Sequence, residues 1–155
     1  MQMYRREHYL AKLRPFYDDV GLIKVVTGIR RCGKSSLLCS VMDELRERGV
    51  AEGNICCINL DRREYQGVNT PEKLDAVIEH SLGKSASTRY LFIDEIQNVK
   101  GYEAIVNGWR EEGDCSIFIT GSNSYLLSGE LATKLTGRYL SLIHISEPTR
   151  LDVIS

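Results

Sequence analysis

The sequence predicts an α/β protein in which a mostly parallel sheet is covered by helices on both faces. Two observations carry this prediction. Short apolar runs typical of buried strands alternate with segments whose apolar residues recur at helical spacing. Glycine or a Thr-Pro pair marks the helix boundaries. Strands that alternate with helices form βαβ units, which place parallel strands side by side in one sheet.

The elements follow one another in a regular order. The first helix comes after a glycine-rich turn and ends at Gly49. The second begins with Thr70 as N-cap and Pro71 at the first helical position. The third passes through Trp109 and ends near Gly113. The four expected strands are LIKVVT (22–27), NICCINL (54–60), YLFID (90–94) and CSIFIT (115–120).

Composition narrows the class of protein. The 155 residues suffice for one domain with a core, and 43% hydrophobic with 26% charged residues is typical of globular proteins. The net charge of −1 gives no global basic field for nucleic acid or anionic membrane. The five cysteines contain no CxxC pair, and the N-terminus is charged where a signal peptide is apolar. We expect a soluble, cytoplasmic protein that does not contact a membrane.

The stretch GIRRCGKSS separates the first strand from its helix and contains Gly28-x4-Gly33-Lys34-Ser35. Glycines let the backbone N–H groups wrap a polyphosphate, and the following helix N-terminus favours negative charge. Lys34 would neutralise the β- and γ-phosphates, and the Ser35 hydroxyl would bind Mg²⁺. The predicted nucleoside triphosphate site comprises Gly28, Arg31, Cys32, Gly33, Lys34, Ser35 and Ser36.

A second motif, LFIDE, ends an apolar strand in two carboxylates, Asp94 and Glu95. Asp94 would share the Mg²⁺ with Ser35, and Glu95 would polarise a water for attack on the γ-phosphate. Alone, an acidic pair after a strand is common; with the phosphate loop it favours catalysis. The strand at 54–60, between the two motifs, favours the ATPase branch that carries a catalytic glutamate. The sequence has no Asn-Lys-x-Asp motif of a GTPase, and small-molecule kinases more often carry an arginine-rich lid.

Three further residues are weaker candidates. Thr120 and Asn123 stand at the end of the fourth strand, where a polar side chain lies between the other two motifs. They could hydrogen-bond the γ-phosphate or the attacking water, although turn chemistry also favours this composition. Arg138 could reach a nucleotide, even that of a neighbouring subunit, as an arginine finger. A solvated arginine after a helix explains the same spacing.

Residues 4–139 resemble prokaryotic AAA-type ATPases that carry a C-terminal domain of unknown function. The resemblance lies in IKVVTGIRRCGKSSLL, YLFIDEIQNV and IFITGSNSYLLSGELATKLTGRY. It implies a P-loop NTPase three-layer sandwich that binds ATP and Mg²⁺, and it adds weight to Thr120, Ser122 and Arg138. Gln97 of DEIQ carries over as a functional position whose role is unassigned. Members of the family continue with a last core strand, a lid and a long C-terminal domain.

The final stretch, LSLIHISEPTRLDVIS (140–155), departs from that pattern. Its codons can spell the transposase adapter of tagmentation sequencing libraries, in a frame that holds through every residue of the stretch. We therefore expect an incomplete ATPase core at 1–139 and a non-native tail at 140–155. The native last strand, the lid and the C-terminal domain of the parent would then be missing. The apolar start of the tail can still occupy the position of a strand.

The leading functional hypothesis is Mg²⁺-dependent ATP hydrolysis that drives a conformational change in an attached or partner domain. The alternative is a regulatory switch that holds ATP with negligible turnover; a small-molecule kinase is a third, weaker hypothesis. The expected partners are ATP and the missing domain of the parent. A second copy of the chain, in a homo-oligomer, is a further candidate partner. Arginine pairs such as Arg30 and Arg31 are explained equally well by solvation, so they do not support a nucleic-acid partner.

Overall fold

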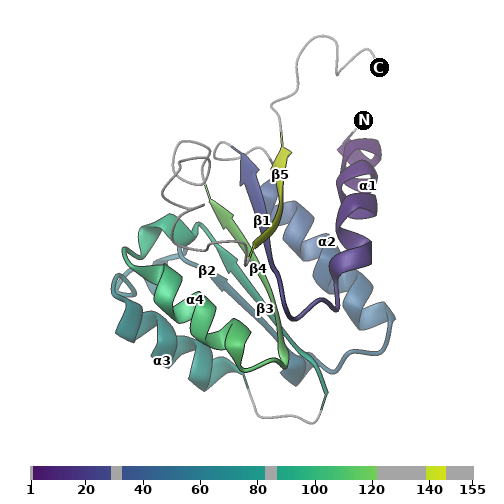
Figure 1. Cartoon of the computed structure of the whole chain (residues 1–155). Helices are drawn as coiled ribbons and strands as arrows, with labels where there is room; N and C mark the ends of the chain where they lie inside the picture. Colours follow the sequence, from purple (N-terminus) through teal and green to yellow (C-terminus); the bar gives the residue numbers. More distant parts are fainter. Residues whose placement is uncertain (1, 29–32, 83–86, 122–138, 146–155) are drawn as a thin grey trace.

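The central feature of the fold is a five-stranded parallel sheet with helices on both faces (Figure 1). The computed structural model describes residues 2–28, 33–82, 87–121 and 139–145. Every neighbouring pair of strands is parallel, in the order β2-β3-β4-β1-β5. This confirms the predicted α/β class. The strands are β1 (Ile23–Gly28), β2 (Ile55–Asn59), β3 (Arg89–Asp94), β4 (Cys115–Gly121) and β5 (Tyr139–Ile145).

Helices cover the sheet in two pairs, with α1 and α2 on one face and α3 and α4 on the other (Figure 1). Three of the four helices were predicted from apolar spacing, and α1 was not. Short 3₁₀ turns connect several elements, and η4 (Ile96–Asn98) will matter for the site. The helices are α1 (Gln2–Leu13), α2 (Lys34–Glu47), α3 (Pro71–Ser81) and α4 (Tyr102–Glu111).

The order of strands corrects one step of the sequence argument. Strand β2, which lies between the phosphate loop and the acidic motif along the chain, is at the edge of the sheet. The strand inserted between β1 and β3 in space is β4. The carboxyl end of β4 therefore lies between the ends of the strands that carry the two motifs, which places Thr120 next to both.

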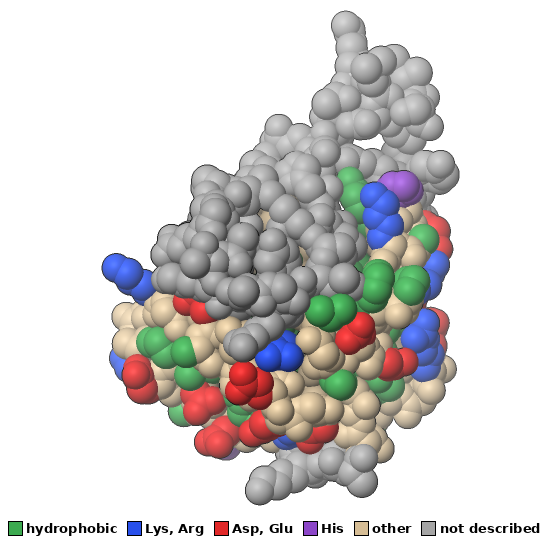
Figure 2. All heavy atoms as spheres, in the orientation of Figure 1, with side chains coloured by type: hydrophobic (Ala, Val, Ile, Leu, Met, Phe, Trp, Pro, Cys, Tyr) green, Lys and Arg blue, Asp and Glu red, His purple; other side chains and the backbone are tan. Residues whose placement is uncertain are grey.

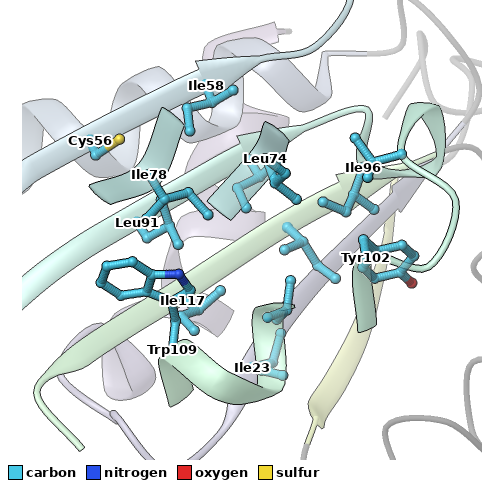
Figure 3. Close-up of a cluster of buried hydrophobic side chains, with 14 of the residues drawn as sticks. Ile23, Cys56, Ile58, Leu74, Ile78, Leu91, Ile96, Tyr102, Trp109 and Ile117 are labelled. Atoms are coloured by element: carbon cyan, nitrogen blue, oxygen red, sulfur yellow. The ribbon is translucent and has the colours of Figure 1, made fainter. Parts of the chain in front are cut away.

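Each face of the sheet has its own apolar core, because side chains alternate between the faces along each strand. Val25 packs into the core under α3 and α4, while its neighbour Val26 packs into the core under α1 and α2. The first core is the one drawn in Figure 3, where Leu91 and Ile117 of the sheet lie among residues of the helices. Its helix and turn residues include Leu74, Ile78, Ile96, Tyr102, Val106 and Trp109.

The α3–α4 pair is fixed by two polar contacts. Thr70 Oγ1 accepts a hydrogen bond from Lys73 N at 3.3 Å, which confirms the predicted N-cap of α3. The indole Nε1 of Trp109 in α4 donates to Asp75 Oδ1 in α3 at 2.8 Å. The buried indole (Figure 3) thus satisfies its only donor while it joins the two helices.

The described surface carries charges of both signs. On the face drawn in Figure 2, Lys and Arg side chains are interspersed with Asp and Glu. Among the described helices none is long and apolar enough to cross a bilayer. In the described part of the chain Cys39, Cys56, Cys57 and Cys115 are free thiols, and burial raises the pKa of Cys56 to about 11.

Candidate functional site

The N-terminus of α2 lies close to the end of β1, since Lys34 in the first turn of the helix contacts Gly28. Gly33 is the N-cap of the helix and has φ 103°, in the left-handed region that glycine tolerates best. The helix then begins at Lys34, and its first turn contains no acidic residue. The unpaired N–H groups of such a turn and the helix dipole together favour an anion at this end. The geometry therefore fits the predicted phosphate loop.

The Lys34 side chain turns back toward the end of β1 and does not extend into solvent. Its side chain is 4% exposed, and Nζ donates to the carbonyl oxygen of Gly28 at 2.8 Å. The same Nζ lies 3.0 Å from Glu95 Oε1 in an ion pair whose partners are both buried. The basic residue of one motif and the second acid of the other are thus in direct contact.

The two acids lie where β3 ends. Asp94 accepts a hydrogen bond from the hydroxyl of Ser35 in α2 through Oδ2, and one from the hydroxyl of Thr120 in β4 through Oδ1. Thr120 Oγ1 in turn accepts from the backbone N–H of Glu95 at 3.0 Å. One fully buried threonine hydroxyl therefore holds the side chain of one acid and the backbone of the next.

Glu95 is the only non-glycine residue among those described that has positive φ, at 60°. This left-handed conformation turns the chain from β3 into η4 and directs the Glu95 carboxylate back toward Lys34. Gln97, within η4, donates from Nε2 to Glu95 Oε2 at 3.3 Å. Each carboxylate oxygen of Glu95 thus has its own described partner.

Most of the predicted site residues that the structure describes come together. Ser36 is exposed in the first turn of α2, where its carbonyl oxygen accepts from Ser40 Oγ at 3.1 Å. Arg31, Cys32, Asn123 and Arg138 lie outside the described residues. The residues brought into one network are Gly28, Gly33, Lys34, Ser35, Asp94, Glu95 and Thr120.

Sequence reasoning missed three contacts within this network. It assigned Thr120 to the phosphate or the water, whereas the structure shows its hydroxyl on Asp94 and on the Glu95 N–H. It gave Gly28 only a backbone-wrapping role, although the Gly28 carbonyl binds Lys34. It left Gln97 without a role, and only the DEIQ pattern marked that position.

The donor set fits magnesium and a polyphosphate. Ser35 and Asp94 offer a hydroxyl and a carboxylate, the hard oxygen ligands that Mg²⁺ prefers, and they already touch each other. Within the described part of the chain no group of three or more His, Cys, Asp or Glu residues gathers as a metal site. Two protein ligands suit Mg²⁺, which in phosphate-transfer sites keeps waters and phosphate oxygens in its shell.

Comparison with known proteins identifies the family of this chain. Residues 21–146 match the AAA domain family, which is most of the chain. The chain belongs to the AAA domain family. This AAA domain is 44% identical over 140 residues to an uncharacterized protein of Haemophilus influenzae, and 35% identical over 118 residues to one of Methanocaldococcus jannaschii. The matches cover 90% and 76% of this chain but only 35% and 25% of those relatives.

Solved structures resemble the AAA domain in fold. The origin recognition complex of Drosophila bound to DNA aligns with TM-score 0.64 and 15% identity, over 97% of this chain and 43% of that one. PCH-2 of C. elegans aligns with TM-score 0.59 and 16% identity, over 92% of this chain and 41% of that one. The family and the fold together support nucleotide binding and hydrolysis in general terms.

Proposed function

We propose that this AAA domain binds ATP with Mg²⁺ and hydrolyses it, and that the cycle changes the conformation of an attached or partner domain. The observation that carries the proposal is the network of polar contacts at the carboxyl ends of β1, β3 and β4. In this network Ser35 contacts Asp94, and Lys34 contacts Glu95. The groups needed for binding and for hydrolysis are therefore in one place.

In the proposed function the loop and Lys34 bind the phosphates. Backbone N–H groups at the N-terminus of α2 face the anion, and the Lys34 ammonium approaches it from the side of β1. Because Lys34 Nζ also pairs with Glu95, its ammonium has to exchange a carboxylate for phosphate oxygens. This exchange couples the arrival of the phosphates to the position of Glu95.

Ser35 and Asp94 would hold the metal, with Thr120 fixing the second oxygen of the Asp94 carboxylate. Bound Mg²⁺-ATP supplies the phosphoanhydride bond to be cleaved and a cation that neutralises charge on its oxygens. Glu95 then acts as the base that takes a proton from the attacking water. Thr120 keeps its backbone in place through the Glu95 N–H.

The proposal also covers the length of the parent protein and the origin of its last residues. We propose that residues 1–139 are part of a longer parent with a C-terminal domain, and that 140–155 derive from a sequencing adapter. The shares of the relatives that the chain covers, 35% and 25%, support a longer parent. Two residues outside the described part of the chain belong to the proposal: Asn123 would hydrogen-bond the γ-phosphate or the attacking water, and Arg138 would reach the nucleotide of its own chain or of a neighbour.

A Glu95→Gln substitution tests the proposal in the parent chain. The amide keeps the shape of the side chain but cannot accept the proton of the water, so we expect turnover to fall about 10²- to 10⁴-fold. ATP binding should persist. Phosphate release measures the first quantity, and filter binding of labelled ATP measures the second.

Glu64→Gln is the matched control, because Glu64 is an exposed glutamate in the 3₁₀ turn η3 (Arg63–Tyr65). Its turnover should equal that of the wild type. Unchanged turnover in Glu95→Gln would refute the assignment of the base. Wild-type protein that holds ATP without turnover would favour the regulatory switch.

A further inference from the structure

Gln97 sits on a turn that is fixed at both ends. Ile96, at the start of η4, is fully buried in the core under α3 and α4 (Figure 3). Asn98, at its end, donates from Nδ2 to the carbonyl of Leu60 at 3.3 Å and to Asp61 Oδ1 at 3.0 Å. Since both neighbours are held, the backbone of Gln97 has a defined place beside the end of β3.

The described polar contact of the Gln97 side chain goes to Glu95. Nε2 donates to Glu95 Oε2, and a carboxylate requires a donor there, which settles the orientation of the amide. The other amide atom, Oε1, is buried and has no hydrogen-bond partner among the described residues. Lys34 meanwhile occupies the opposite oxygen, Oε1 of Glu95. Lys34 and Gln97 therefore contact different oxygens of the Glu95 carboxylate.

This sharing matters because Glu95 is only 4% exposed. A buried carboxylate that loses its cation keeps a large desolvation cost unless another donor holds it. In the proposed function Lys34 turns from Glu95 to the phosphates. At that moment Gln97 Nε2 still donates to the carboxylate, which keeps one of its oxygens in place.

We propose that Gln97 is a positioning residue that acts through Glu95, an inference that rests on the proposed ATP hydrolysis. It holds the carboxylate after Lys34 has moved to the phosphates, so it lowers the free-energy cost of that exchange. It also keeps Glu95 aimed at the attacking water. Gln97 thus assists both nucleotide binding and turnover, and both effects require the charge on Glu95.

The test is a double-mutant cycle with Gln97→Met and Glu95→Gln in the parent chain. Methionine preserves the length of the side chain and removes the donor. We expect Gln97→Met to weaken binding of Mg²⁺ with adenylyl imidodiphosphate about tenfold and to lower turnover by a similar factor. In the Glu95→Gln background the same change should leave affinity for the analogue unaltered, because no carboxylate remains to be held.

Gln66→Met is the matched control, since Gln66 is exposed and follows η3. An equal loss of affinity in both backgrounds would mean that Gln97 only stabilises its turn, and would overturn the inference. Wild-type affinity and turnover in Gln97→Met, with turnover lost in Glu95→Gln, would overturn the inference alone. Wild-type protein that binds the analogue but does not hydrolyse ATP would overturn the proposed function and this inference with it.

Discussion

At the scale of single residues, Glu95 combines a strained backbone with a buried charge. A left-handed conformation of a non-glycine residue costs on the order of 1–3 kcal/mol and persists only where neighbours fix it. Here Thr120 holds the Glu95 N–H, and the following Ile96 is anchored in the core. An extended Glu95 would continue along β3 and move its carboxylate away from Lys34. The strain is therefore the physical condition for the contact.

Lys24 is a second buried cation, and its contacts lie at the other end of β1. Its side chain is 1% exposed, and Nζ donates to the carbonyls of Asp19 and Leu22 and to Ser116 Oγ. The ammonium also lies 4.8 Å from the centre of the Phe118 ring. Burial lowers the pKa of Lys24 to about 8, from 10.5 for an exposed lysine.

This shift predicts a pH dependence of stability. Between about pH 8 and pH 10.5 the unfolded chain keeps a proton on Lys24 that the folded chain has lost, so the Lys24 contribution to stability rises with pH. Across this whole pH range the Lys24 contribution to the free energy of unfolding changes by about 3 kcal/mol, at about 1.4 kcal/mol per pKa unit. The measurement is the free energy of unfolding by urea for wild type and Lys24→Met at several pH values.

The comparison with Lys24→Met is needed because other groups titrate in the same range. Burial raises the pKa of Cys56 to about 11 and of Cys115 to about 12, which lowers stability as pH rises above about 9. The Cys56 contribution is common to both proteins and cancels in the difference, whereas Lys24 also lowers the pKa of Cys115, so the part of the difference below about pH 9 reports on Lys24 most directly. A difference that stays constant from pH 7.5 to 10 would show that burial does not penalise the Lys24 ammonium.

The sequence predicted that the main candidate residues would lie close together, as the structure shows, but it did not predict their individual contacts. The spacing of the two motifs fixes Lys34, Ser35, Asp94 and Glu95, because the chemistry demands those groups in that order. The hydroxyl of Thr120 goes to Asp94 because β4 lies beside β3, and such a neighbour relation is absent from any local pattern. Contacts between distant elements have to be observed.

At the scale of elements, α1 shows where periodicity is weak. Among its described side chains, Leu10 and Leu13 are buried against the sheet and α2. Arg14, just after the helix, pairs with Glu44 of α2 at 2.8 Å, and this contact lowers the pKa of the Glu44 carboxyl. The helix therefore forms through tertiary docking, which a local reading of the sequence does not detect.

The N-cap of α3 gives an element-scale prediction. Thr70→Ala removes the acceptor for the Lys73 N–H, and we expect a loss of about 1 kcal/mol in the free energy of unfolding. Thr70→Ser, which keeps the hydroxyl, should restore most of it. Thermal or urea unfolding measures both. Equal stability of Thr70→Ala and wild type would mean that solvent replaces the cap without cost.

The strands themselves were predicted to within a few residues, and the end of the fourth strand was expected between the two motifs, whereas the full order of the sheet was not predicted. Apolar runs such as 90–94 define strands locally, because burial on both faces demands continuous hydrophobic sequence. The position of β4 between β1 and β3 depends on how the crossovers wind through space. Only the resulting neighbourhood explains why Thr120 belongs to the site.

At the scale of the whole molecule, β5 pairs with β1 in parallel and occupies the edge of the sheet. Its register shifts between Lys24 and Val25, which pair with Leu140 and Leu142. The family match extends to residue 146, past the expected end of the native sequence at 139. The sequence argument had allowed the tail to take a strand position, and its origin stays a prediction.

Sequencing the source DNA outward from the codons for IFITGSNS tests that prediction. We expect the reading frame to continue beyond codon 139 into a different last strand, a lid and a further domain. Reads that reproduce LSLIHISEPTR would show that the tail is genuine. The regulatory switch would then gain over hydrolysis coupled to a C-terminal domain.

The alignment of β3 with β4 ties activity to correct assembly. Ile93 is paired with Ile119, so the next residues along, Asp94 and Thr120, face the same side of the sheet. A slip of one residue between these strands would turn the Thr120 hydroxyl to the opposite face. The Glu95 N–H would then lose its acceptor, and the ion pair with Lys34 would lose its support. A chain with this misregistered pair of strands would therefore not hydrolyse ATP. Activity would be confined to chains whose sheet is correctly assembled.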